Sequence, residues 1–167
     1  MEHLSSRVFE RAAQQFVLMD SYLDSISAGC GTFVYPRSLD ASGALVTSDS
    51  KWWCSGFFPG SLWLVYEYTH DENIKSLALK YTQPLSPLQY RTDDHDIGFQ
   101  LMCSFWNAYC QTGNKDFLSV ICNGASSLAD INGASGWVTS SVTNMSAMFN
   151  GASSLADIND PSGWGTS

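Results

Sequence analysis

A ten-residue stretch, NGASSLADIN, begins at Asn123 and recurs letter for letter at Asn150. The similarity continues beyond it, so that 15 of 18 aligned residues are identical at an offset of 27. Fewer than two full repeat units are present, whereas solenoid repeats generally need about three or more to bury a continuous core. We therefore predict a non-repetitive part, residues 1–122, followed by an incomplete tandem repeat of 27-residue period, residues 123–167, with little stability of its own.

The composition changes at the same boundary. The only charged residues after Cys122 are Asp130, Asp157 and Asp160, and every Lys, Arg, Glu and His precedes it. The chain carries 16 acidic and 8 basic side chains, a formal net charge of −8. Because binding to phosphate groups needs clustered Lys and Arg, this balance argues against a nucleic-acid or anionic-membrane surface. No apolar run approaches the ~20 residues needed to cross a bilayer.

The amino terminus, MEHLSSRVFERAAQQF, lacks a basic start followed by an apolar stretch, so no export signal is expected. As written, the chain predicts a cytoplasmic protein, with the periplasm or cell surface as alternatives if the true amino terminus is missing. The five cysteines include no Cys-x-x-Cys pair, and we expect them to be reduced and mostly buried. His3, His70 and His95 show no ligand spacing with the cysteines, so neither a metal site nor a cofactor is expected.

Helical periodicity dominates the first 122 residues. The first segment places one apolar stripe at intervals of three to four residues, made of Val8, Ala12, Phe16, Met19 and Leu23. Further helices are predicted from Pro59, from Asp71 to a stop at Pro84, from His95 to a stop at Gly113, and over residues 115–130. Their expected inward residues are Leu62, Trp63, Tyr66, Leu101, Phe105, Ala108, Phe117, Val120 and Ile121.

Between the first two helices, residues 29–50 are rich in Gly, Ser, Pro and Asp and are expected to form a long structured loop. A loop of that length inside a compact domain is usually functional. Helix follows helix with loops between them, and no strand pattern intervenes. The first 122 residues are therefore predicted to be all-α.

Two short motifs contain the residues best suited to chemistry. In KWWCSGFFPGSLW, Trp53 and Phe57 precede a helix start, and flat aromatic rings beside polar groups are typical of carbohydrate sites. The alternative is that these aromatic residues belong to the core. In DDHDIGF, Asp96 has a carboxylate and His95 an imidazole that can donate to a substrate. The alternative for Asp96 is a plain N-cap of the helix that follows.

Together these motifs carry a resemblance to a known family. The segments FVYPRS, GALVTSDSKWWCSGFFPGSLWLVYEYT, ALKYTQPL and HDIGFQLMCSFWNAYCQTGNKDF occur in this order. They resemble the amino-terminal portion of the unsaturated glucuronyl hydrolases, a glycoside hydrolase family that includes unsaturated chondroitin disaccharide hydrolases. The resemblance covers roughly residues 6–122, with W-x-S-G-F-F-P-G and H-D-x-G-F as its specific motifs. It implies a partial (α/α)6 barrel, about its first third, with four to five helices.

The resemblance also implies a reaction and a substrate. The family removes a 4,5-unsaturated uronic acid from the oligosaccharides that polysaccharide lyases release, by hydrating the C4=C5 bond. An acid protonates C4, water adds at C5, and the resulting hemiketal opens and expels the sugar. The expected partner of this chain is thus an unsaturated uronic-acid disaccharide or oligosaccharide.

Residue by residue, the resemblance implies that Asp96 is one of two essential aspartates and that His95 contacts substrate. It implies that Trp53 and Phe57 form the aromatic wall of the sugar subsite. The second aspartate, the usual general acid/base, lies beyond the matched residues, and Asp130 and Asp157 match no family motif. We therefore expect this chain alone to be inactive, and we expect its uncovered apolar helix faces to favour self-association.

The tail has a resemblance of its own. GWVTSSVTNMSAMFNGASSLADINDPSGWGTS is similar to the leucine-rich-repeat-like modules of BspA-type bacterial surface proteins. This implies an irregular or leucine-rich-repeat-like structure. Two alternative functions follow, a surface-type binding module and a recombined fragment with neither function intact.

Overall fold

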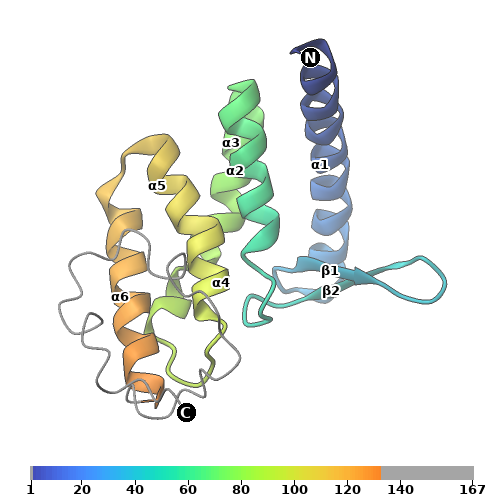
Figure 1. The fold of residues 1–167 in the computed structure, drawn as a ribbon. Helices are drawn as coiled ribbons and strands as arrows, with labels where there is room; N and C mark the ends of the chain where they lie inside the picture. The colour runs from blue at the N-terminus through green and yellow to red at the C-terminus, as the bar shows by residue number, and fades with distance from the viewer. Residues whose placement is uncertain (1, 133–167) are drawn as a thin grey trace, which may run out of the picture.

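The computed structural model describes residues 2–132 (Figure 1). Its long helices are α1 (Glu2–Cys30), α2 (Phe57–Thr69), α3 (Glu72–Thr82) and α6 (Lys115–Asn132). Shorter elements are β1 (Tyr35–Leu39), β2 (Leu45–Ser48), the 3-10 helix η1 (Gln83–Tyr90), α4 (Ile97–Leu101), the π-helical turn η2 (Met102–Trp106) and α5 (Asn107–Thr112). The mostly helical architecture predicted from the sequence is confirmed.

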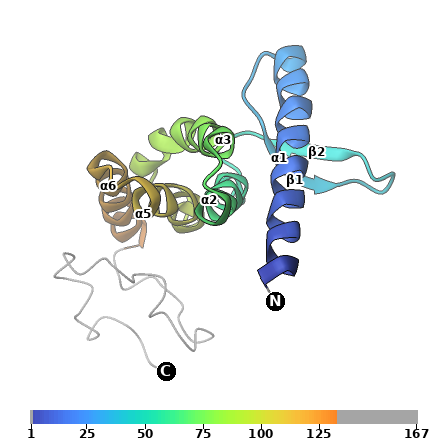
Figure 2. The same ribbon diagram turned by 90° about the horizontal axis from the view of Figure 1, so that it is seen from above.

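The helices form three groups that lie side by side. Figure 1 shows α1 on one side, the hairpin of α2 and α3 in the middle, and α4–α5 with α6 on the other side. Seen from above in Figure 2, the same order holds, and the β-hairpin extends past α1 on the side away from the other helices. Because α4, η2 and α5 follow one another without a break, the helix predicted from His95 to Gly113 is one helical stretch with a π turn inside it. Gly113 ends it in the left-handed conformation, with φ of 69°.

The prediction of a loop at residues 29–50 is wrong in part, because this segment contains an antiparallel hairpin of β1 and β2. Asp40 closes its turn, since one carboxylate oxygen accepts hydrogen bonds from the backbone of Ser42 at 2.8 Å and of Ala44 at 3.0 Å. Gly43 supplies the positive φ of 84° that the turn requires. The strands have only five and four residues, too short for an alternating pattern to stand out from the polar turn residues between them.

The core is centred on α2, α3 and the α4–η2 stretch. Trp63 is fully buried and donates a hydrogen bond of 2.9 Å from its indole nitrogen to the Thr82 hydroxyl. The expected inward residues Leu62, Leu101, Phe105, Ala108 and Phe117 are all buried, and Tyr66, Val120 and Ile121 pack against them. Of the stripe on α1, Leu23 is buried, whereas Val8 is 58% exposed. Phe9, Ala12, Phe16, Met19 and Ile26 are partly buried against the core, so the first helix contacts it from Phe9 onward.

The cysteines differ from the prediction. All five are free, as expected, but Cys30, Cys110 and Cys122 are exposed rather than buried. None of the helices in residues 2–132 is both long and apolar enough to cross a membrane. The predicted repeat tail from residue 133 onward, including the second copy of NGASSLADIN, lies outside the described residues.

Candidate active site

Two glycines let the start of α2 approach the α4–η2 stretch at backbone contact. A Cβ atom on Gly60 would lie 2.6 Å from the carbonyl oxygen of Cys103, and one on Gly56 would meet the carbonyl oxygen of Gln100. Pro59 stands in the first turn of α2, where its missing N–H costs nothing, although the helix begins two residues earlier than predicted, at Phe57. The glycines of the W-x-S-G-F-F-P-G motif thus bring the aromatic loop against α4.

The aromatic residues of this motif divide between core and surface. Phe58 is buried, whereas Trp53 is 43% and Phe57 39% exposed. The ring of Trp53 meets that of Phe57 edge-on, with centroids 5.5 Å apart. Phe99 of α4 completes the group, with its ring centroid 6.4 Å from Trp53 and 6.3 Å from Phe57. We call Trp53, Phe57 and Phe99 the aromatic cluster; an exposed group of rings in this geometry can stack against the apolar face of a sugar.

Hydrogen bonds fasten the loop that carries the cluster. The buried side chain of Gln100 donates from its amide nitrogen to the carbonyl oxygens of Ser50 at 3.2 Å and Trp52 at 2.9 Å. Arg91 donates to the carbonyl oxygen of Lys51 at 3.2 Å. Because the side chains of Gln100 and Arg91 fix three consecutive carbonyl groups, the backbone ahead of Trp53 is held in one conformation.

The carboxylates of the DDHDIGF motif have different partners. Arg91 pairs with Asp93 at 2.8 Å and with Asp94 at 3.3 Å, and its hydrogen bond holds the pKa of Asp93 below the usual range. Asp94 also accepts a hydrogen bond of 2.9 Å from the backbone N–H of Asp96. Among residues 2–132, the carboxylate of Asp96 pairs only with the imidazole of His95, at 3.6 Å, and this pair is ionic only when the imidazole is protonated.

Asp96 stands at the N-cap position of α4 without capping it. Its side chain makes no capping hydrogen bond, although it is only 25% exposed, while the His95 side chain is 78% exposed. The N-cap alternative therefore does not explain this carboxylate. A mostly enclosed carboxylate without an N–H donor among the described residues is available to accept a hydrogen bond from a bound molecule.

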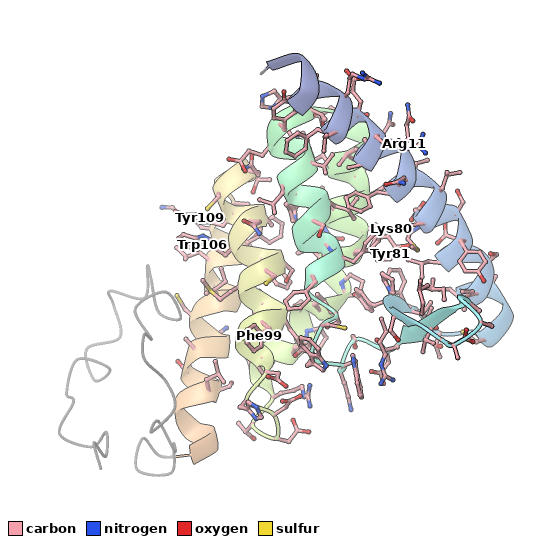
Figure 3. The ribbon with its side chains drawn as sticks, turned by 45° about the vertical axis from the view of Figure 1, so that its right-hand side comes forward. Arg11, Lys80, Tyr81, Phe99, Trp106 and Tyr109 are labelled. Atoms are coloured by element: carbon pink, nitrogen blue, oxygen red, sulfur yellow. The ribbon has the colours of Figure 1, made fainter. Side chains whose placement is uncertain are left out.

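Of the four site residues predicted from the sequence, Trp53 and Phe57 lie together, and His95 and Asp96 lie together. Phe99 joins the two pairs, since it belongs to the cluster and its backbone N–H donates to the carbonyl of Asp96 at 3.0 Å. Figure 3 shows Phe99 beside the lower end of α2, where the loop enters that helix. The sequence prediction missed Phe99; its position three residues after Asp96, on the same helical face, was the available signal. Within residues 2–132, no three or more His, Cys, Asp or Glu side chains are arranged to hold a metal ion.

Proteins of known function with sequences similar to this chain are found among the hydrolases. The chain is 36% identical over 96 residues to an unsaturated glucuronyl hydrolase of Formosa agariphila, covering 56% of this chain and 24% of the relative. It is 30% identical over 99 residues to an unsaturated chondroitin disaccharide hydrolase of Streptococcus agalactiae, covering 58% of this chain and 25% of the relative. No family model matches the chain.

Solved structures of unsaturated glucuronyl hydrolases are also similar to this chain. An unsaturated glucuronyl hydrolase of Streptococcus agalactiae matches with a TM-score of 0.64 and 25% identity, over 76% of this chain and 31% of that one. An unsaturated glucuronyl hydrolase described as specific for heparin matches with a TM-score of 0.54 and 42% identity, over 57% of this chain and 26% of that one.

The fold and these matches together define the class of protein. The helical part of the chain is similar to a portion of an (α/α)6-barrel glycoside hydrolase, which confirms the fold predicted from the sequence. Within that class, the family that the amino-terminal part resembles in both sequence and structure is that of the unsaturated glucuronyl hydrolases. The chain spans about a quarter of the length of the curated relatives it matches.

Proposed function

We propose that residues 2–132 provide part of a site that binds a 4,5-unsaturated uronic acid at the end of a glycosaminoglycan oligosaccharide. The observation that carries this proposal is the exposed aromatic cluster close to Asp96, whose carboxylate makes no capping hydrogen bond. Both lie in a segment similar to unsaturated glucuronyl hydrolases. The rings contact the apolar face of the sugar, and the carboxylate accepts a hydrogen bond from one of its hydroxyl groups. His95 is exposed and adjacent, so it can donate to the same ligand.

The reaction proposed for the complete site is the hydration of the vinyl ether. A carboxylic acid gives its proton to C4, and water adds its oxygen to C5 as its own proton passes to the carboxylate. The product is a hemiketal, which opens by breaking the bond from C5 to the ring oxygen and then releases the neighbouring sugar as an alcohol. This step needs one group that serves as acid and then as base, which differs from the two-carboxylate scheme of most glycosidases.

We propose that this chain alone binds the sugar without turning it over. It spans about a quarter of the relatives' length, and the family resemblance assigns to it only Asp96 of the two essential aspartates. The experiment is to purify residues 1–167, titrate them with an unsaturated chondroitin disaccharide by tryptophan fluorescence, and follow the absorbance of the C4=C5 bond. Binding without loss of absorbance supports the proposal. If no binding is detected, the proposal is refuted. If the chain does turn the disaccharide over and Asp96→Asn abolishes this turnover, only the proposed lack of activity is refuted.

A matched pair of aspartates separates binding from stability. Asp71 caps α3, because its carboxylate accepts a hydrogen bond of 2.8 Å from the backbone of Asn73, whereas Asp96 caps nothing. Asp71→Ala should lower the free energy of unfolding by about 1 kcal/mol and leave affinity unchanged. Asp96→Ala should leave stability nearly unchanged and weaken disaccharide binding at least about tenfold, the value of a hydrogen bond to a charged group. The opposite pattern would show that Asp96 is a structural residue.

We also propose that the chain associates with a second copy of itself through apolar surface on α1. Val8, Val17, Leu18 and Tyr22 are each at least 44% exposed, and exposed apolar surface of this kind favours association. Light scattering after size exclusion should show a mass that falls to that of one chain in Leu18→Glu. A single-chain mass for the unmodified protein at tens of micromolar would refute this.

A further inference from the structure

The strand β1 has a bulge at Arg37. In the register with β2, Pro36 pairs with Thr47 and Ser38 pairs with Val46, so Arg37 is the extra residue between them. A bulge of this kind turns the side chain of the extra residue away from the regular alternation, and such bulges occur often beside active sites. The Arg37 side chain points at the loop that carries the aromatic cluster, since its guanidinium carbon lies 3.7 Å from the ring centroid of Trp52.

The stacking occupies one face of the guanidinium and leaves its edge free. Arg37 is exposed, Trp52 is 37% exposed, and no described residue forms a hydrogen bond or an ion pair with the Arg37 side chain. Arg91, the other arginine at this site, is paired with Asp93 and Asp94. Arg37 is therefore a cation held in place at this loop without a carboxylate partner among residues 2–132. Its five N–H donors lie in the guanidinium plane, the geometry that carboxylates and sulfates bind in two-point fashion.

The positive charge of Arg37 reaches the loop. Burial raises the pKa of the Cys54 thiol, and the field of Arg37 partly opposes that rise. Trp52 and Trp53 are consecutive, so the stacked guanidinium lies one residue along the loop from the aromatic cluster. The carbonyl of Trp52 is held by Gln100, which keeps this spacing fixed. Arg37 therefore offers a positive charge to a saccharide that extends from the cluster along this loop.

We propose that Arg37, stacked on Trp52, forms a subsite that binds an anionic substituent, a sulfate ester or a carboxylate, of the saccharide held by the aromatic cluster. This inference rests on the proposed function. The role differs from that of the cluster, which recognises the apolar face of a sugar and is indifferent to charge. The subsite therefore predicts affinity that depends on the ligand's charge and on salt.

The test compares Arg37→Met with Arg37→Lys in the full chain. Methionine keeps the apolar stem and removes the charge, whereas lysine keeps the charge and loses the planar fork. Arg11→Met, on the upper part of α1 and away from Phe99 in Figure 3, removes the same charge elsewhere. The probes are an unsulfated and a monosulfated unsaturated chondroitin disaccharide, titrated by isothermal calorimetry. The titrations are made at about 20 mM NaCl, where charge interactions are weakly screened, and at about 500 mM NaCl, where they are strongly screened.

At low salt, Arg37→Met should weaken binding roughly tenfold, with Arg37→Lys between it and the wild type and Arg11→Met unchanged. At high salt, the difference between Arg37→Met and the wild type should shrink. A loss confined to the sulfated disaccharide assigns the subsite to the sulfate, and an equal loss for both assigns it to the uronate carboxylate. Unchanged affinity, or a loss that salt does not reduce, overturns the subsite alone. If the wild type binds neither disaccharide, the proposed function fails with it.

Discussion

The hydroxyl of Ser127 donates a hydrogen bond of 2.7 Å to the backbone carbonyl of Gln89, although 38 residues separate them. Asn123, on the same face of α6, donates from its amide to the side-chain oxygen of Gln89 at 2.8 Å. Gly124 is buried, and a Cβ atom there would meet the side chain of Leu101. The first copy of NGASSLADIN is therefore helical and packed against η1 and α4, as the helix predicted over residues 115–130 requires.

This packing predicts a stability loss at Leu128, which is 8% exposed. Leu128→Ala should lower the free energy of unfolding by about 2–4 kcal/mol, because it removes buried apolar atoms and leaves a cavity. Urea unfolding followed by circular dichroism measures the change. The same substitution in the second copy, Leu155→Ala, has identical neighbours in sequence. A comparison of the two therefore separates the effect of tertiary position from that of local sequence. An unchanged midpoint for Leu128→Ala would contradict the packing of α6.

The close approach of α2 to η2 predicts that Gly60 tolerates no side chain. Gly60→Ala places a Cβ atom 2.6 Å from the carbonyl of Cys103, so one backbone must move, and we expect a loss of at least about 1–3 kcal/mol in unfolding free energy. Gly29→Ala is the matched control, since nothing lies within 4 Å of its added Cβ atom and the residue is helical. That change should be neutral or stabilising by up to about 1 kcal/mol. Equal effects of both substitutions would rule out the backbone contact.

Phe57 and Phe58 are neighbours of the same residue type with opposite exposure, 39% and 8%. Phe58→Ala should cost about 3–5 kcal/mol of stability, because its ring packs edge-on against Phe16 and Tyr81 in the core. Phe57→Ala should leave the unfolding midpoint nearly unchanged and weaken binding of an unsaturated disaccharide. Thermal unfolding and tryptophan fluorescence titration on both variants provide the check. Undiminished affinity in Phe57→Ala would remove this residue from the sugar site.

Two buried tyrosines predict a loss of stability in alkali. Burial raises the pKa of Tyr35, and burial together with a hydrogen bond to Asp20 raises the pKa of Tyr81, both well above the usual range. The folded state thus keeps protons that the unfolded state releases above about pH 10. The contribution of these two tyrosines to the free energy of unfolding should stay level up to that pH and fall above it. Urea unfolding from pH 8 to pH 11 measures this, and Tyr35→Phe with Tyr81→Phe should flatten the fall. An equally steep fall in that double variant would assign it to other groups.

Local sequence signals were sufficient to predict the helices and to name four residues of the candidate site, but not Phe99. Apolar spacing predicted the helices, and Gly113 predicted where the α4–α5 stretch ends, because these signals are local. The motifs around Trp53 and Asp96 predicted the candidate site residues Trp53, Phe57, His95 and Asp96. The β-hairpin was missed because its short strands leave too few alternating positions to register as a pattern.

Local sequence did not determine which of several identical residue types faces the core. Gly56 and Gly60 let α2 pack closely against α4 and η2, and in this packing Phe58 faces the core whereas Phe57 faces outward. Likewise, the letters of NGASSLADIN do not by themselves decide burial in the copy at residues 123–132, where Ser127 is buried against Gln89 and Leu128 against Gly98. Amino-acid type and spacing therefore determined the helices and the chemical groups, whereas the contacts between distant segments decided which of those groups are buried and which remain available to a ligand.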